Sequence, residues 1–230
     1  MYYLCYEFRQ TCLEMSNTKW LSTSIGRKFF MSLTGLFLIT FLTLHLAINL
    51  LTLVDKDLFN EAAHFMATNV VIQAMQYILA LGFIIHIGLG IFLTLQNSKA
   101  RPKKYAYNKP SANSGISSRS MIYSGLLVLV FLVLHIKDYF VELKFGDMNG
   151  FSNDYDLVVA LFGMWQYTLV YVLAFIALGF HLNHGFQSAF QSLGANHSRY
   201  TPAIKKISSI YCVVVTVGFS AIAIVHFVNS

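Results

Sequence analysis

The sequence has few charged residues. Only 11% of its 230 residues are Asp, Glu, Lys or Arg, whereas 56% are apolar, and soluble domains usually carry about 25% charged residues. The apolar residues form five runs that can cross a bilayer, which takes about 20 residues each. Because backbone groups in lipid need partners within their own segment, we predict an all-α membrane protein with five transmembrane helices in an up-and-down bundle. The predicted spans are about 28–53, 68–95, 120–141, 158–190 and 205–228, and their central parts contain no Asp, Glu, Lys or Arg.

Cysteine is also scarce. The chain has three cysteines, Cys5, Cys12 and Cys212. They form neither a CxxC nor a CxxCH motif, which argues against disulfide bonds and covalently attached haem. Residues 1–27 contain no apolar core, so no cleaved signal peptide is expected. Since Met15 begins a stretch typical of a natural start, we expect residues 1–18 to be a cytoplasmic arm, disordered or not native, before a transmembrane domain over 19–230.

The net charge is +6. The charged residues are divided between the segments on the two sides of a membrane, so this charge does not indicate a nucleic-acid partner. If the N-terminus is cytoplasmic, the inner segments carry most of the Lys and Arg, as the positive-inside rule requires. The C-terminus is then outside. The outer segments carry the acidic residues, with only three basic ones, Lys56, Lys137 and Lys144.

One phrase occurs twice. Residues 34–45 read TGLFLITFLTLH and residues 124–135 read SGLLVLVFLVLH. Both lie in spans that run from inside to outside, so the two helices are parallel and present equivalent faces at equal depth. The repeat therefore makes His45 and His135 potential partners.

Histidines lie at membrane depth in four of the spans. An ionisable side chain there is costly and usually has a functional partner; a neutral imidazole hydrogen-bonded between helices is the alternative. At about 1.5 Å per residue, His45 and His135 lie roughly 25 Å from the inner boundary. His86 and His181 lie roughly 20 Å from it by the same rise. The four residues thus form two layers, and His184 follows one turn after the last of them.

Two facing imidazoles at one depth in an apolar bundle supply both axial ligands of a six-coordinate haem. Zinc is the competing metal, but it usually takes four ligands that include Cys or carboxylate, and the sequence offers no such cluster. Small residues lie four positions before and after two of the histidines, where a flat macrocycle needs room; close helix packing is the alternative. These are Gly82 and Gly90 around His86, and Ala177 and Gly185 around His181.

Hydroxyl residues begin both copies of the repeat. Eleven residues make about three turns, so Thr34 shares a face with His45 and Ser124 shares one with His135. We expect these hydroxyls near haem propionates, unless they bond to their own helix backbone. Other candidate propionate contacts are the basic residues Arg27, Lys28, Arg119 and His184.

These features resemble the di-haem cytochrome b membrane subunit of succinate dehydrogenase and fumarate reductase, of the single-polypeptide five-helix kind. The resemblance covers about residues 19–228. Its features are one histidine in each of the first four spans, Ser32-x-Thr34-Gly35-Leu36-Phe37 before His45, and Phe180-His181-x-x-x-Gly185 running to Gly194. The glycine spacing favours His181 over His184 as the ligand.

The resemblance implies two haems b between the first four helices: a distal one held by His45 and His135, and a proximal one held by His86 and His181. It implies a flavoprotein with FAD and an iron–sulfur protein on the cytoplasmic face of a bacterial inner membrane, and it allows a dimer of such heterotrimers. Electrons would pass between succinate and a quinone, expected to be menaquinone, with no dicarboxylate chemistry on this chain. The basic residues Lys99, Arg101, Lys103 and Lys104 could help dock the soluble subunits, or could be topology signals alone.

Three other functions stay open. The same complex can run as a quinol:fumarate reductase. Other quinone-linked cytochromes b exist, but many place two haem-ligating histidines on one helix. A haem-free transporter would use the histidines to relay protons. In addition, some members of the family carry a glutamate in helix four where this chain has Gly179 and Phe180.

The quinone needs a group that exchanges protons with its ring. The segment 54–67 is acidic, and we predict that it is a short external loop between the first two spans. It offers Glu61 and His64, which are three residues apart and lie on one side if the second helix has already begun there. We predict a quinone site at these residues; a solvated helix start is the alternative.

Overall fold

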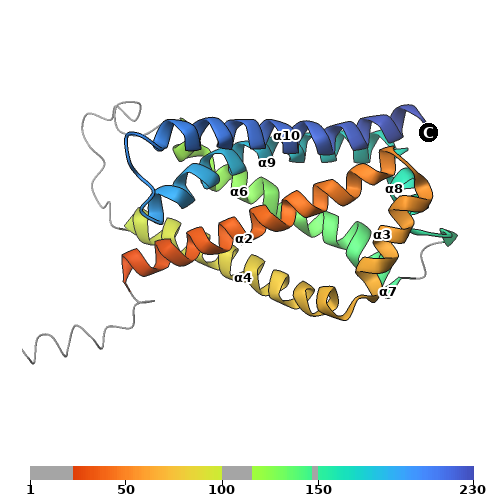
Figure 1. Cartoon of the computed structure of the whole chain (residues 1–230), viewed down its shortest axis with the longest axis horizontal. Helices are drawn as coiled ribbons and strands as arrows, with labels where there is room; N and C mark the ends of the chain where they lie inside the picture. Colours follow the sequence, from red (N-terminus) through yellow and green to blue (C-terminus); the bar gives the residue numbers. More distant parts are fainter. Residues whose placement is uncertain (1–22, 100–115, 147–149) are drawn as a thin grey trace, which may run out of the picture.

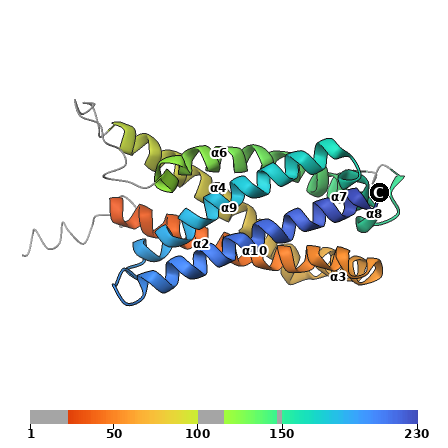
Figure 2. The same cartoon turned by 90° about the horizontal axis from the view of Figure 1, so that it is seen from above.

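The computed structural model of the chain describes residues 23–99, 116–146 and 150–230, and of residues 116–120 only the backbone. The described part is helical. Its long helices lie side by side, and each runs opposite to the one before it (Figure 1 and Figure 2). They are α2 (Ser24–Leu50), α4 (Val70–Lys99), α6 (Ile116–His135), α9 (Trp165–Ser192) and α10 (Thr201–Val228).

Four helical segments are long and apolar enough to cross a membrane: Ser24–Leu53, Val70–Lys99, Trp165–Ser192 and Thr201–Val228. The first joins α2 to the short 3₁₀ helix η2 (Leu51–Leu53). Only 6% of the apolar core of α4 is buried in the protein, against 33% for α10. Apolar side chains left outside on this scale are typical of a lipid-facing surface. The chain therefore has the helices of a multi-pass membrane protein.

The third predicted span is not among these four. The helix α6 ends at His135 and continues through a π-helical turn, η3 (Ile136–Val141), into the short α7 (Glu142–Phe145). A π-helical turn widens the backbone spiral and is frequent at functional sites. The prediction of membrane-spanning helices is thus confirmed for four of the five segments.

The fourth predicted span, 158–190, consists of two helices. The first is α8 (Asp154–Phe162), which ends before Gly163, and α9 begins at Trp165. Across the break, the Thr168 hydroxyl donates a 2.7 Å hydrogen bond to the Phe162 carbonyl. This bond satisfies a carbonyl that the end of a helix leaves without an internal partner.

The segment 54–67, predicted as a short external loop, is mostly the helix α3 (Lys56–Thr68). The Asp55 carboxylate accepts a 2.8 Å hydrogen bond from the Leu58 backbone N–H, and an acidic N-cap of this kind stabilises a helix start. Phe59 is only 6% exposed. The sequence prediction was wrong here because acidic residues were taken as a loop signal, although they cap an amphipathic helix.

Charge divides the two ends of the bundle. At the end where α2, α6 and α10 begin lie basic residues, and we call it the basic end (Figure 1). At the other end lie α3, α7, α8 and every acidic residue that the structure describes, and we call it the acidic end. The described basic-end side chains are Arg27, Lys28, Lys99, Arg199, Lys205 and Lys206; the acidic ones are Asp55, Asp57, Glu61, Asp138, Glu142, Asp154 and Asp156.

The helix α9 lies at the centre of the packing and contacts α10, α6 and α2, whereas α4 packs mainly on α2 and α3. The buried core lies toward the acidic half of the bundle. Its largest members are aromatic and come from α3, α8, α9 and α10: Phe59, Phe162, Tyr171, Phe175 and Phe219. This core fixes α9 and α10 and leaves α4 more exposed.

Candidate functional site

Two histidine pairs lie between the helices. The rings of His45 on α2 and His135 on α6 have centroids 5.8 Å apart and planes at 84°. The rings of His86 on α4 and His181 on α9 have centroids 6.3 Å apart and planes at 78°. The first pair lies toward the acidic end and the second toward the basic end, as follows from the helix directions. Each pair joins two helices that run in the same direction.

The spacing of each pair fits one metal ion between the rings. An imidazole nitrogen binds a metal at about 2 Å and the ring centroid lies roughly 1 Å farther back, so two rings on opposite sides of one ion have centroids about 6 Å apart. Both measured separations, 5.8 and 6.3 Å, are close to this value. Among the described residues, no three or more His, Cys, Asp or Glu side chains gather to hold a metal. The donor sets that the described residues bring together are therefore pairs of imidazoles, whereas zinc usually takes four ligands.

The pair nearer the basic end, His86 and His181, lies against the two glycines of the repeat. A Cβ atom at Gly35 would lie 3.4 Å from Cε1 of His86. A Cβ atom at Gly125 would lie 3.3 Å from Cε1 of His181. The distance at Gly125 is tight for a side-chain atom and the distance at Gly35 is close to ordinary contact, so a side chain larger than that of alanine would press on the imidazole. The repeated glycine therefore has a structural reason: each copy lets the next antiparallel helix bring its histidine close.

The repeat also extends beyond the original twelve residues. A methionine lies three positions before each hydroxyl, and its methyl group faces a glycine one turn after the histidine of the neighbouring helix. Met31 faces Gly90 in this way, at 3.5 Å from the Cβ position, and Met121 faces Gly185 at 3.8 Å. The helix pairs α2–α4 and α6–α9 are thus built alike. Each supplies one histidine to each layer.

Polar neighbours differ between the four rings. The Thr34 hydroxyl donates to backbone carbonyls of its own helix and lies 3.3 Å from Nδ1 of His86. If this hydroxyl oxygen accepts from Nδ1–H, the Nε2 lone pair of His86 is left for a metal. A metal-ligating histidine is usually oriented by an acceptor of this kind. The Asn49 amide nitrogen lies 3.4 Å from Nδ1 of His45 and donates to the backbone carbonyl of His45 at 2.8 Å.

On the other two histidines, Nδ1 of His135 and Nδ1 of His181 are buried without a hydrogen-bond partner in the described part of the chain. Burying such an atom without a partner costs about 1–3 kcal/mol. The two rings are therefore incompletely satisfied by the protein alone, which fits imidazoles that serve an additional ligand.

The small residues around His86 and His181 have the following neighbours. Gly82 is buried, and its Cβ position lies 3.0 Å from the ring of Phe37, so this glycine serves close packing of α2 on α4. Gly90 and Gly185 face the flexible ends of methionine side chains. Ala177 is half-buried on α9. Close packing, the alternative interpretation, thus accounts for Gly82.

The predicted propionate contacts are placed as follows. The Ser124 hydroxyl donates a 3.0 Å hydrogen bond to the Met121 carbonyl of its own helix. This bond is the alternative to a propionate contact that the sequence left open. The Arg27 guanidinium lies over the ring of Phe92 and donates to Gln96, on α4. Lys28 is exposed at the basic end. His184 is half-buried on α9, and the side chain of Arg119 lies outside the described residues.

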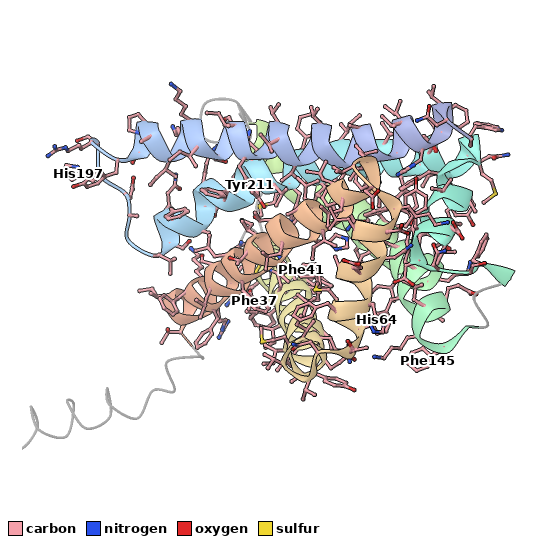
Figure 3. All side chains as sticks on the ribbon, turned by 45° about the vertical axis from the view of Figure 1, so that its right-hand side comes forward. Phe37, Phe41, His64, Phe145, His197 and Tyr211 are labelled. Carbon is pink, nitrogen blue, oxygen red and sulfur yellow. The ribbon has the colours of Figure 1, made fainter. Side chains whose placement is uncertain are left out.

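The predicted quinone residues Glu61 and His64 both lie on α3, not at the start of the second span, and both are exposed. Figure 3 shows His64 on the outside of the acidic end, far from His197 at the basic end. Burial raises the pKa of the Asp154 carboxyl, and the nearby His64 opposes this rise. Glu61 and His64 therefore lie on an exposed face of α3, as the alternative interpretation expects.

Sequence reasoning missed a buried carboxylate beside the acidic-end pair. Asp138 lies in the π-helical turn, and its side chain is only 6% exposed. It accepts a hydrogen bond from the Tyr171 hydroxyl at 3.4 Å, and the Tyr171 ring lies 6.1 Å from that of His135. The Tyr139 ring is 5.2 Å from His135, and its hydroxyl is buried without a partner in the described part. From the sequence alone, Asp138 is interpreted as the polar end of a span. The one feature that could have indicated its burial is its position three residues after His135, which ends the second copy of the repeat.

Comparison of the chain with family models, with curated proteins and with solved structures gave no significant match. The family resemblance therefore rests on the residues described above.

Proposed function

We propose that this chain is the membrane anchor and cytochrome b subunit of a succinate:quinone oxidoreductase, with two haems b and with α6 to α7 as a fifth span. The observation that carries the proposal is the presence of two imidazole pairs, at 5.8 and 6.3 Å, in an apolar helical bundle. His86 and His181 would hold the haem nearer the basic end. His45 and His135 would hold the one nearer the acidic end.

A haem held by two imidazoles would supply a one-electron carrier. The residues of this chain would have three tasks around it. Thr34 orients the ring of His86. The glycines at 35 and 125 allow the close approach of the histidines from the neighbouring helices. The apolar helices exclude water, which favours electron transfer between fixed sites over exchange with solvent.

The soluble partners would bind the basic end. This side carries Arg27, Lys28 and Lys99 in the described part, and basic residues mark the cytoplasmic side of a membrane protein. A flavoprotein and an iron–sulfur protein docked there would deliver electrons from succinate first to the haem that His86 and His181 would hold. Quinone, expected to be menaquinone, would react at the acidic end. Fumarate reduction is the same path in reverse.

The first prediction tests this proposal directly. The protein, purified in detergent, should contain two non-covalent haems b per chain in a pyridine haemochrome assay, because there are two imidazole pairs and no CxxCH motif. A co-purified complex should also reduce an artificial dye with succinate. One haem per chain, or none, would contradict the proposal. Two haems without succinate activity would indicate a different quinone-linked cytochrome b.

A further inference from the structure

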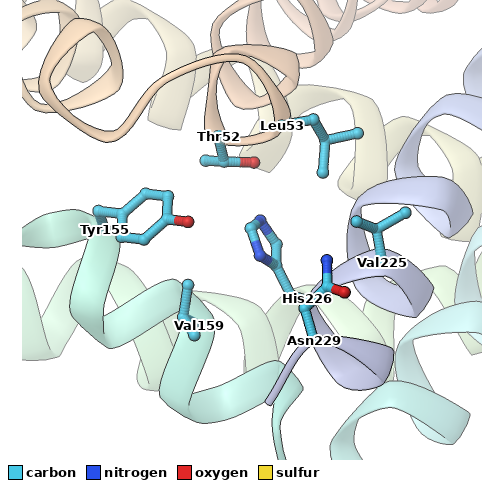
Figure 4. A pocket seen from close by; sticks show the side chains of 7 residues that line it. All are labelled: Thr52, Leu53, Tyr155, Val159, Val225, His226 and Asn229. Atoms are coloured by element: carbon cyan, nitrogen blue, oxygen red, sulfur yellow. The ribbon is translucent and has the colours of Figure 1, made fainter.

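A cavity of about 190 Å³ lies at the acidic end, between η2, the helix α8 and the end of α10. Figure 4 shows the imidazole of His226 standing in the middle of it, with the Tyr155 hydroxyl pointing toward that ring. The cavity is separate from both histidine pairs. Its lining residues are Thr52, Leu53, Tyr155, Val159, Val225, His226 and Asn229.

His226 is the feature that indicates a ligand. Its side chain is 5% exposed, and Nε2 is buried without a hydrogen-bond partner in the described part of the chain. A buried polar atom usually has a partner in the protein or in a bound molecule. Because this nitrogen lines an open cavity, a bound molecule can complete its hydrogen bonding.

The cavity combines a polar centre with apolar walls. His226, Tyr155 and Asn229 offer hydrogen-bonding groups, and leucine and valine side chains form the remaining walls. The Tyr155 ring is held in place: it stands perpendicular to the His226 ring at 5.7 Å, and its backbone N–H donates to Asn60 on α3 at 3.1 Å. Rigid polar groups among apolar walls are typical of sites that bind a flat, mostly apolar molecule.

The size and charge of the cavity narrow the ligand class. Drug-sized ligands occupy about 300–1,000 Å³, so this cavity admits a ring and leaves any tail outside. Leu53 and Val225 are 37% and 40% exposed, so the cavity wall reaches the apolar outside of the bundle, where such a tail would lie. None of the seven lining residues is Lys or Arg, which disfavours a phosphate-bearing lipid headgroup.

The cavity is also close to the acidic-end histidine pair. The ring of Phe219 on α10 lies 5.8 Å from that of His45. His226 follows Phe219 by seven residues, which is two turns on the same face and about 10 Å along the helix. The cavity therefore lies about two helical turns from a residue that contacts the acidic-end pair.

We propose that the His226 cavity binds the ring of the quinone, with His226 hydrogen-bonded to one ring oxygen. This inference rests on the proposed function and moves the quinone from Glu61 and His64 to α10. Reduction of the quinone to the quinol takes two electrons, which succinate supplies in the proposed function, and two protons. The imidazolium form of His226, protonated by water at the acidic end, donates the first proton to a ring oxygen and becomes a neutral imidazole that this water protonates again. Water there supplies the second proton.

The second prediction tests this site by substitution. His226→Leu should lower quinone-linked succinate oxidation by about 100-fold, the usual size of a lost acid–base group, with dye-linked oxidation and haem content unchanged. His226→Gln keeps a hydrogen-bond donor but carries no exchangeable acid, so it should lower kcat while KM for quinone stays near the original value. His197→Gln, at an exposed histidine of the basic end, is the matched control and should change nothing. Unchanged quinone turnover in His226→Leu would overturn the inference.

A measurement on the unaltered complex covers the case in which substitution disturbs folding. An azido derivative of the quinone should label a peptide that contains residues 220–230, or one that contains Tyr155. Labelling confined to residues 56–68 of α3, or unaffected by competing quinone, would overturn the cavity assignment alone. Absence of a haem spectrum in the same preparation would instead overturn the proposed function.

Discussion

Among single residues, the two neighbouring histidines of α9 have different surroundings. The ring of His181 lies 6.3 Å from that of His86 and against Gly125 of the repeat. His184 lies one turn closer to the basic end and is half-buried. The pairing geometry therefore favours His181 over His184 as the ligand in the proposed haem site.

The third prediction follows from this difference. His181→Ala should remove one of the two haems, because an imidazole at this position forms the pair with His86. His184→Ala should leave both haems bound and at most shift a reduction potential. Haem content per chain and redox titration measure the two effects. Loss of a haem in His184→Ala but not in His181→Ala would reverse the assignment.

The sequence was sufficient to predict which histidines meet, but not which polar groups become buried. His45 and His135 end two copies of one phrase in parallel helices, so helical periodicity alone predicts equal depth. The burial of Asp138 depends on a π-helical turn, and that of His226 on how α8 folds over the end of α10. Neither event leaves a periodic signal in the sequence.

Between elements, α9 and α10 pack through a glycine. A Cβ atom at Gly179 would collide with the Thr216 hydroxyl, which donates to the Phe175 carbonyl at 3.3 Å. Small residues of this kind let membrane helices approach closely. Gly179 is therefore a buried residue at the contact between α9 and α10. The next residue, Phe180, is 65% exposed. The structure thus leaves no room for a carboxylate side chain at position 179.

The fourth prediction is that Gly179→Ala destabilises the protein. Overpacking a tight core site costs about 1–3 kcal/mol, so the thermal midpoint in detergent should fall. Gly88→Ala on α4 is the control, because a Cβ atom there meets nothing within 4 Å. That change should be neutral or slightly stabilising, as alanine favours a helix over glycine by about 1 kcal/mol. Equal effects of the two substitutions would refute the packing argument.

Element boundaries were predicted less well than element existence. Each of the five apolar runs is helical in the structure. The break between α8 and α9 was missed because Gly163 and Met164 interrupt a run that stays apolar throughout. The helix α3 was missed because its single buried aromatic, Phe59, is a weak signal among acidic residues. Both errors lie at the acidic end, where short helices pack by tertiary contacts and not by a long apolar pattern.

In the whole molecule, each histidine pair joins two helices that make few direct contacts with each other. The helix α4 packs mainly on α2 and α3, whereas α10 packs on α9, α2 and α8. One pair joins α4 to α9 and the other joins α2 to α6. A metal between His86 and His181 would therefore tie α4 to α9, whereas α6 and α10 already pack directly on α9.

The fifth prediction is that haem binding stabilises α4 more than α10. A ligand at about 1,000 times its dissociation constant stabilises the folded state by roughly 4 kcal/mol, and local opening of a helix can carry such an energy by itself. Protein produced without haem should therefore exchange the amide hydrogens of α4 up to about 1,000-fold faster than the haem-loaded protein, as measured by mass spectrometry in detergent. The amides of α10 serve as the internal control and should change much less, since α10 is packed on three other elements. His86→Ala should reproduce the fast exchange of α4 even when haem is supplied. Equal protection of α4 with and without haem would show that the histidine pairs do not hold the bundle together.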